Sequence, residues 1–391
     1  VYTVTPRSSA GNLCYGDAFV ITVPVTSVPT APALSTVVPN ACSDGSFTIN
    51  PDTYITNGQT GGSYAWVGSY DAGLTVVTAG TSPGTITETL RNESGGVLFA
   101  TYTVTPTLGG CVAPPFDIRI RIESEPDAVD VTASAQCSDA SYTINPQSYI
   151  TNGVASSFVW AAAPDPLLVV VSAGAGTGVI TETYRNEQTG PLNVVYTVTP
   201  TAIGGQTCAG DVFTITVPIK AEPDALATQT LANRCSDVSF TITPQSYITN
   251  SVASSFTWVA AYGAGLSGGA GTGSGNISET LTNVSGATAS VTYTVTPTGL
   301  NGCLGDPFDL VVPIEAEPVG TSVTEAAACS GVGFTVDLQA NIDLTDVIAS
   351  TFSWSAVYPA GLTGGAASGT GDIAETLTNL TGGTLNAVYT V

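Results

Sequence analysis

The chain contains no histidine and no methionine, and only 7 of its 391 residues are lysine or arginine. Without an imidazole, neither a Ser-His-Asp nor a Cys-His nucleophile can form, and a histidine-ligated zinc site is excluded. The 30 Asp and Glu residues give a net charge of −23, so the chain cannot make the row of phosphate contacts that a nucleic-acid binder needs. We therefore expect no nucleic-acid partner and no enzymatic activity.

Long apolar runs are also missing, although 43% of the residues are hydrophobic. No stretch is long enough to cross a bilayer, and the opening residues lack the basic start and apolar core of a signal peptide. Only 9% of the residues are charged, which is not the composition of a disordered chain. β-Branched residues separated by Gly and Pro instead favour many short strands. We predict a folded all-β chain without a membrane span, whose targeting or anchoring segments lie outside it.

Internal repetition is the strongest feature of the sequence. The tripeptide Tyr-Thr-Val recurs every 94 to 100 residues, with its tyrosine at Tyr2, Tyr102, Tyr196, Tyr293 and Tyr389. One tryptophan recurs with each period, at Trp66, Trp160, Trp258 and Trp354. A period of this length fits a whole β-sandwich of about 100 residues and is too long for a solenoid unit. We expect the four tryptophans, with Tyr102, Tyr196 and Tyr293, to anchor the sandwich cores.

One period divides into seven strand-like segments at its turn residues. In residues 125–221 these segments are 129–135, 141–144, 157–161, 167–172, 179–184, 194–199 and 212–218, which we assign as strands A to G. In strand G, Phe213, Ile215 and Val217 alternate with Thr214 and Thr216, as a half-buried strand requires. The sequence predicts a tandem array of immunoglobulin-like, seven-stranded β-sandwiches that forms an extended rod.

The repeats place the domain boundaries at acidic, proline-containing linkers such as Glu125-Pro126-Asp127. We expect a partial repeat with strands F and G at 1–29, whole repeats at 30–124, 125–221 and 222–316, and a partial repeat with strands A to F at 317–391. Proline restricts the linker backbone, so the joints should be stiff. The two ends are in register, which fits a segment of a longer array or a hairpin that completes a neighbouring molecule.

Three motifs in fixed order carry a family resemblance. Cys-Ser-Asp opens a unit, Ser/Thr-Phe/Tyr-x-Trp lies in its middle, and Tyr-Thr-Val-Thr-Pro-Thr precedes a Gly-rich turn with one Cys. This pattern resembles the PKD-like, immunoglobulin-like repeats of very large Bacteroidota surface proteins, including gliding-motility adhesins of the SprB type. The fourth unit departs from it, with Cys329-Ser330-Gly331 at its head and 337–341 in place of Pro-x-Ser/Thr-Tyr-Ile-Thr-Asn.

The resemblance implies export to the cell surface and a role in an adhesin or filament, where the repeats form a stiff stalk. The expected partners are further repeats of the same polypeptide or fibre, together with a surface or glycan ligand. A second hypothesis is an array of modules whose loops bind carbohydrate or protein.

The chain has eight cysteines, two per period, and no Cys-x-x-Cys motif. In a secreted chain this pattern favours disulfides over a metal site. In an immunoglobulin-like topology, the first cysteine of a unit lies in the A–B loop and the second lies in the F–G loop, at the opposite pole. A strand of about nine residues spans roughly 30 Å, whereas bonded cysteines have Cα atoms within about 7 Å.

This geometry predicts disulfides between adjacent repeats, Cys42 with Cys208 and Cys137 with Cys303. Four cysteines would then find partners beyond this segment, namely Cys14, Cys111, Cys235 and Cys329. A competing hypothesis keeps the bonds inside each repeat, pairing Cys42 with Cys111, Cys137 with Cys208 and Cys235 with Cys303. The sequence leaves both hypotheses open.

Acidic residues also gather near the predicted joints. Asp139, Glu222, Asp224 and Asp306 could supply oxygen ligands for a structural Ca²⁺ ion, although we favour a solvated acidic surface that keeps the fibre soluble. A repeated glutamate in strand E is expected to point outward, at Glu88, Glu182, Glu279 and Glu375. The asparagines that follow it are expected to form exposed turns, at Asn92, Asn186, Asn283 and Asn379.

Overall fold

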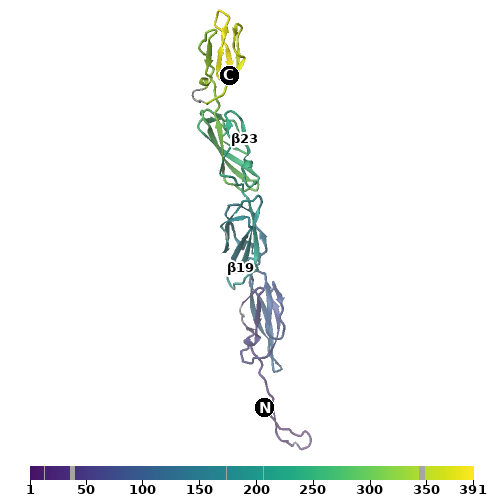
Figure 1. Cartoon of the computed structure of the whole chain (residues 1–391). Helices are drawn as coiled ribbons and strands as arrows, with labels where there is room; N and C mark the ends of the chain where they lie inside the picture. The colour runs from purple at the N-terminus through teal and green to yellow at the C-terminus, as the bar shows by residue number, and fades with distance from the viewer. Residues whose placement is uncertain (13, 36–39, 173, 206, 343–347) are drawn as a thin grey trace.

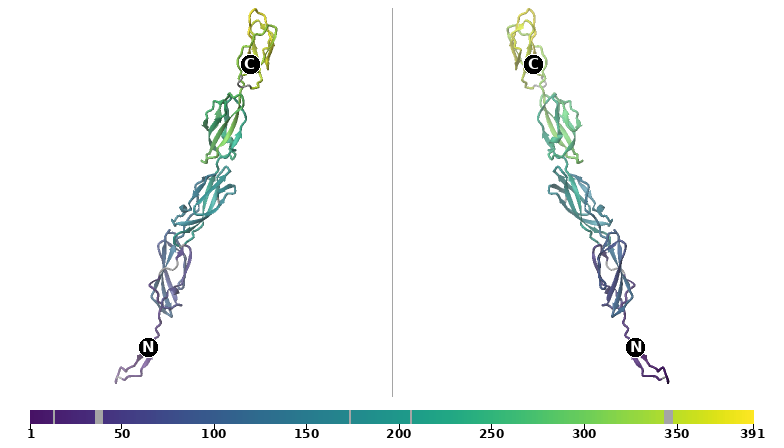
Figure 2. Two further views of the ribbon diagram at one scale, coloured as in Figure 1. Left: turned by 90° about the vertical axis from the view of Figure 1, so that its left-hand side faces the viewer. Right: turned by 90° about the vertical axis from the view of Figure 1, so that its right-hand side faces the viewer.

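The computed structural model describes residues 1–12, 14–35, 40–172, 174–205, 207–342 and 348–391. Four β-sandwich units follow one another as an extended rod, and a hairpin at the N-terminal end projects from it (Figure 1). The two views in Figure 2 show the same end-to-end arrangement. The predicted all-β tandem immunoglobulin-like architecture is confirmed. No helix in the described ranges is long and apolar enough to cross a membrane.

The chain begins with a short hairpin and continues into a complete sandwich. The hairpin pairs β1 (Tyr2–Val4) with β2 (Phe19–Ile21). In the unit at 30–124, one sheet contains β3 (Leu34–Ser35), β4 (Ala41–Cys42), β6 (Ser63–Tyr70), β9 (Leu98–Leu108), β10 (Cys111–Val112) and β11 (Phe116–Glu123). The other sheet contains β5 (Ser46–Ile49), β7 (Leu74–Thr78) and β8 (Ile86–Asn92).

The units at 125–221 and 222–316 repeat this arrangement. The second unit has β12 (Val131–Thr132), β13 (Gln136–Cys137), β15 (Ser156–Pro164), β17 (Ala175–Thr177), β19 (Leu192–Ala202) and β20 (Phe213–Lys220) facing β14 (Tyr142–Ile144), β16 (Leu168–Ser172) and β18 (Ile180–Asn186). The third has β21 (Thr228–Thr230), β22 (Arg234–Cys235), β24 (Ser254–Tyr262), β26 (Thr272–Ser274), β29 (Ala289–Gly299) and β30 (Phe308–Glu315) facing β23 (Phe240–Ile242), β25 (Leu266–Ser267), β27 (Ile277–Glu279) and β28 (Thr282–Asn283).

The fourth unit carries strands equivalent to B through F. They are β31 (Gly333–Val336), β32 (Ser353–Val357), β33 (Leu362–Thr363), β34 (Ser368–Thr370), β35 (Ile373–Thr376), β36 (Thr378–Asn379) and β37 (Val388–Thr390). A 3₁₀ turn follows strand B in every unit, as η1 (Pro51–Tyr54), η2 (Pro146–Tyr149), η3 (Pro244–Tyr247) and η4 (Gln339–Asn341).

Strand A departs from the prediction because it is split and pairs parallel to strand G. In the second unit, β12 lies beside Ile215 and Thr216 of β20, and β13 lies beside Ile219 and Lys220. Pro218 falls in the gap between the two pairings, and Pro313 of β30 falls in the same gap of the third unit. Proline has no N–H to donate, so Pro218 and Pro313 cannot add a ladder bond in this gap.

Each core lies between the two sheets and is filled by inward residues of alternating strands. In β20 the buried residues are Phe213, Ile215, Val217 and Ile219, as the alternation predicts. The tryptophans of strand C are buried, and each packs edge-on against the strand F tyrosine of its unit at 5.5 to 5.9 Å between ring centroids. Tyr102, Tyr196 and Tyr293 are fully buried.

The extra strand beside strand C was not predicted, and a glycine explains its position. A side chain on Gly176 of β17 would put its Cβ 2.6 Å from the indole ring of Trp160. The same close approach recurs between Gly273 and Trp258 and between Gly369 and Trp354. A bare backbone therefore lets β17, β26 and β34 lie across the tryptophan face.

Candidate functional site

One disulfide crosses each of two successive joints between repeats. Cys42 at the end of β4 is bonded to Cys208 in the F–G loop of the next unit, and Cys137 at the end of β13 is bonded to Cys303. The Cα atoms are 5.5 Å apart in each pair. These are the pairs of the inter-repeat hypothesis. Thiols remain in the described structure at Cys14, Cys111, Cys235 and Cys329.

The strand register explains why bonds inside one repeat do not form. Cys137 lies opposite Lys220, at the end of β20, whereas Cys208 precedes the start of β20 at Phe213. Eight strand residues separate the two ends by roughly 26 Å, which no disulfide can span. The competing pairs Cys42–Cys111, Cys137–Cys208 and Cys235–Cys303 are therefore replaced by bonds to the neighbouring unit.

A Thr-Asn pair after the 3₁₀ turn of each of the first three units holds the linker that precedes that unit. The amide of Thr151 donates to the Asp127 carbonyl at 2.8 Å, and Asn152 Nδ2 donates to the Glu125 carbonyl at 2.8 Å. Asn152 Oδ1 also accepts from the Asp127 amide at 3.3 Å. Thr56-Asn57 and Thr249-Asn250 bind the preceding linkers in the same way. The sequence contained this motif, but its role depends on a contact that only the fold reveals.

Two glycines let the loops approach the linker closely. Gly95 of the first unit has a φ of +76°, and a Cβ there would lie 2.1 Å from the Asn152 carbonyl oxygen of the second unit. A Cβ on Gly210 would lie 2.1 Å from the Pro126 carbonyl oxygen. Side chains at either position would push the units apart. The joint is thus a packed interface with a covalent bond, a hydrogen-bonded linker and close loop contacts.

Asn152→Ala is expected to loosen this joint locally. The substitution removes the acceptor for the Asp127 amide and the donor to the Glu125 carbonyl, at a cost of about 1–2 kcal/mol. Amide exchange at Asp127 should accelerate roughly tenfold, as measured by hydrogen exchange with NMR or mass spectrometry. Asn193→Ala, at an exposed position of β19, is the matched control. Equal exchange in the two variants would show that Asn152 does not hold the linker.

Carboxylates from both units meet at the first joint. Asp44, Glu125 and Asp211 line a cavity of about 160 Å³ together with Arg91 and Asn152. Arg91 Nε contacts Asp44 Oδ2 at 3.0 Å, and Ser43 Oγ donates to Glu125 Oε1 at 3.2 Å.

At the second joint, the predicted residues Asp139, Glu222 and Asp306 take the corresponding places. Asp224 Oδ2 instead accepts from Thr249 Oγ1 at 3.1 Å. No group of three or more metal-ligating side chains that could hold an ion occurs in the described part of the chain.

Burial raises the pKa of Glu125 to about 7 and that of Glu222 to about 8, and the neighbouring Asp44 and Asp139 add to the respective shifts. Both values lie above the ordinary pKa of 4.5, so the assembled joint binds a proton more tightly than the unfolded chain. This contribution to stability is complete below the unfolded pKa and is lost as the pH rises through the folded values.

Between pH 5.5 and pH 8.5 the melting temperature is therefore expected to fall, most steeply below pH 7, and to level off above about pH 8. Calorimetry of the Glu125→Gln/Glu222→Gln variant should give a flatter profile across the same range. The exposed Glu187→Gln change serves as the control and should preserve the wild-type slope. An unchanged slope in the double variant would disprove a role for these two protons.

The strand E glutamates contradict the prediction of outward side chains. Glu88, Glu182 and Glu279 are buried, and Glu375 is half-buried. In each unit the carboxylate accepts hydrogen bonds from two tyrosine hydroxyls and one backbone amide, as Glu182 does from Tyr184, Tyr196 and Gly174. The alternation of strand E places the glutamate on the same face as buried residues such as Ile180, so the side chain must point inward. This cluster stabilises the sandwich and is separate from the joint.

The corner asparagines are also more buried than predicted. Asn186 Oδ1 accepts from the amide of Gln188, which is the expected turn, but its Nδ2 donates to the Ile219 carbonyl at 2.7 Å. Asn92 and Asn283 make the equivalent bonds to strand G. These side chains tie the E–F corner to the end of strand G, next to the joint.

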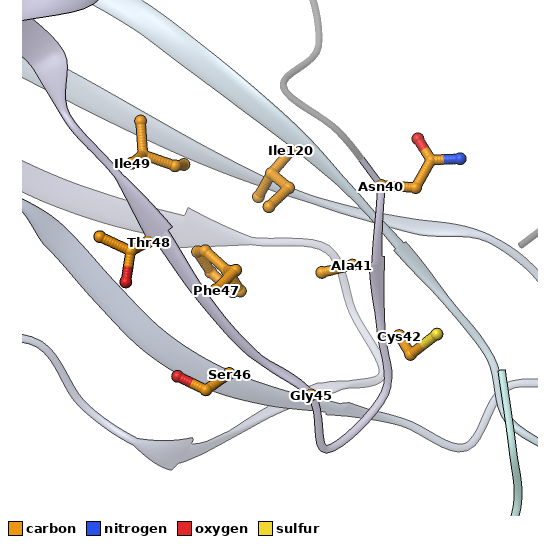
Figure 3. Close-up of a pocket in the computed structure, with 9 residues that line it drawn as sticks. All are labelled: Asn40, Ala41, Cys42, Gly45, Ser46, Phe47, Thr48, Ile49 and Ile120. Carbon is orange, nitrogen blue, oxygen red and sulfur yellow. The ribbon is translucent and has the colours of Figure 1, made fainter.

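A second cavity, of about 280 Å³, opens between β4 and β5 in the first repeat. Figure 3 shows its lining of small and apolar side chains, with Phe47 and Ile120 facing its interior and Cys42 at one end. Its polar side chains are Asn40, Ser46 and Thr48, and none of the described residues that line it carries a charge.

Sequence and structure comparisons address the repeat and its fold. Residues 39–126, 134–223, 232–318 and 326–391 each match the PKD-like domain. Among solved structures, titin domains I67–I69 cover 75% of this chain over 99% of their own length, at 9% identity and a TM-score of 0.28. The FN1–FN3 domains of chicken CNTN1 cover 70% over 95% of their length, at 10% identity and a TM-score of 0.22.

An endo-fucoidan hydrolase of glycoside hydrolase family 107 covers 72% of this chain at 12% identity and a TM-score of 0.20, and the chain spans 43% of that protein's length. Identities this low bear on the fold alone. No curated protein matches the chain. Four successive matches over most of the sequence show that this chain belongs to the PKD-like domain family.

Proposed function

We propose that this chain is a structural segment of a secreted cell-surface adhesin or filament, of the kind found in SprB-type gliding-motility adhesins. The repeats would form a stiff, non-enzymatic stalk that needs no cofactor and projects or carries an adhesive element. The observation that carries this proposal is the pair of disulfide-bonded joints, where Cys42–Cys208 bonds the first unit to the second and Cys137–Cys303 bonds the second to the third. A bond across each of these joints restricts bending, which is useful in a stalk.

An extracellular location is consistent with the disulfides, which persist in oxidising compartments. The net charge of −23 would keep neighbouring rods apart by repulsion. The natural partners are further repeats of the same polypeptide or fibre.

Immunogold electron microscopy of intact cells, with an antibody against the 125–221 repeat, tests the proposal. Gold spaced along thin surface filaments is the expected result. Diffuse label over the envelope, or label only in the medium, would contradict a stalk.

One observation favours a second candidate, an array that binds a carbohydrate or protein ligand. On the outer face of the first repeat, the Arg119 guanidinium lies 3.6 Å from the centroid of the Phe99 ring, and Arg121 follows two residues later on β11. A cation over an aromatic ring is a surface suited to ligand recognition. Its positive charge is opposite in sign to the net charge of the chain. Loss of binding to a glycan array in Arg119→Ala, with Arg185→Ala as the control, would support this alternative.

A further inference from the structure

The two disulfides cross each other along the sequence. Cys137 lies between Cys42 and Cys208, and Cys208 lies between Cys137 and Cys303, so neither loop is contained in the other. Each bond joins cysteines 166 residues apart. Residues 43–207, which include most of the first two repeats, can therefore be bypassed by a single S–S bond. The shortest path of covalent bonds along the rod therefore passes through the S–S bond and not through these residues.

We propose that the crossed disulfides remove the cores of the first two repeats from the path that carries tension, so that the oxidised rod cannot lengthen by unfolding these two repeats. Force that arrives at Cys42 passes to Cys208, then along β20 and the linker into β21 and β22. Strands B to F of the second unit lie outside this route. A rod linked in this way keeps its length under load, whereas a chain of unlinked sandwiches lengthens as each unit unfolds.

The segment that would carry the load is already extended. From Cys208 to Cys235 it consists of strand G of one unit, a short linker and the split strand A of the next. About 27 residues of extended chain measure roughly 90 Å. The two units that it passes are each about 37 Å long, judged from the 11 residues of β19 and of β29. Little slack remains for tension to pull out.

Two such segments run side by side through each of the first three repeats. In the second unit, β20 belongs to the segment 208–235, while β12 and β13 belong to the segment 111–137. They pair in parallel, with Val131 beside Ile215 and Cys137 beside Lys220. Parallel strands pulled in opposite directions resist sliding through all of their hydrogen bonds together. The split strand A, which the sequence did not predict, thus links the two load-carrying segments.

This inference concerns the covalent path itself, and only its biological use rests on the proposed stalk function. Single-molecule stretching of the full chain tests it, with bio-orthogonal handles at the exposed positions Val25 and Val238. With both disulfides intact, the shortest covalent path between the handles contains about 47 residues instead of about 213, so its full length should be shorter by about 600 Å.

The cysteine variants are expected to differ from one another in their full stretched length. Cys42→Ser/Cys208→Ala leaves only the second bond as a shortcut and should be about 130 Å shorter than the variant that also carries Cys137→Ser/Cys303→Ala. Cys235→Ser, which removes a thiol outside both bonds, should behave as the wild type. The final stretched length does not depend on how well a variant folds, so the comparison holds even for an unstable one.

Dithiothreitol offers a second route to the same result. It passes two electrons and two protons to each disulfide and leaves as its cyclic disulfide. The stretched length of the wild-type chain between the two handles should then increase by about 600 Å. If the oxidised wild type stretches as far as the variant without disulfides, tension passes through the cores and the proposal is wrong. A short oxidised length without surface filaments on cells would uphold the load path while rejecting the stalk.

Discussion

Glu182→Ala is expected to lower the free energy of unfolding of the second repeat by about 3–5 kcal/mol. The carboxylate accepts from the Tyr184 hydroxyl at 2.6 Å, the Tyr196 hydroxyl at 2.5 Å and the Gly174 amide at 2.8 Å. Burial raises the pKa of both tyrosines, so their hydroxyls keep their protons and stay donors. Alanine leaves two buried hydroxyls and the Gly174 amide without this acceptor and opens a cavity in the core.

Native-state hydrogen exchange of β19 and β20 is the appropriate measurement, because it reports on one repeat within a chain of several. Glu182→Gln retains an acceptor oxygen and should cost about 1–2 kcal/mol. Glu187→Ala, at a solvent-exposed position just beyond the end of β18, is the matched control and should have little effect. A loss below 1 kcal/mol for Glu182→Ala would mean that the buried cluster does not stabilise the sandwich.

Loss of the Cys42–Cys208 bond should have the second large effect. A crosslink that closes a loop of 166 residues restricts the unfolded chain enough to stabilise the folded one by about 5 kcal/mol in the chain-entropy model. In Cys42→Ser/Cys208→Ala we therefore expect the first two repeats to unfold at lower urea concentration and the joint amides near Asp127 to exchange faster. Equilibrium urea unfolding, followed by hydrogen exchange in each repeat, measures both changes.

Cys235→Ser is the control, because this exposed cysteine belongs to neither disulfide. It should leave the urea midpoint of every repeat unchanged. Reduction of the wild-type chain breaks both disulfides and should reproduce the behaviour of the variant that also carries Cys137→Ser/Cys303→Ala. If reduced and oxidised wild type unfold at the same urea concentration, the bonds do not stabilise the joint.

The sequence was most informative where periodicity alone decides the structure. The 94- to 100-residue spacing located the repeats, and the alternation in strands such as β20 located the core face. For the disulfides, the distance between opposite poles of one sandwich led to the inter-repeat pairs as one of two hypotheses, and only the structure distinguishes them.

Other features depend on tertiary context that period and composition do not reveal. The parallel pairing of strand A with strand G joins residues about 84 positions apart in sequence, and no local pattern marks it. The Thr-Asn contacts with the linker likewise require a neighbouring unit. Glu182 is different, because its position two residues after Ile180 already placed it on the core face. Its charge suggested that the side chain would point outward into solvent. Buried tyrosine hydroxyls instead supply the polar surroundings that the carboxylate needs.

Peptide mapping without reduction tests most directly whether adjacent repeats are covalently joined. Trypsin cleaves after Arg91, Arg119, Arg185 and Lys220, which places Cys42, Cys111 and Cys208 in separate peptides. We predict that the 8–91 peptide is bonded to the 186–220 peptide and that reduction separates them. Because the 8–91 peptide also contains Cys14, fragmentation of the linked peptides assigns the bond to one of its two cysteines. A bond from Cys42 to Cys111 in the 92–119 peptide would lie inside one repeat, and it would contradict the stapled rod.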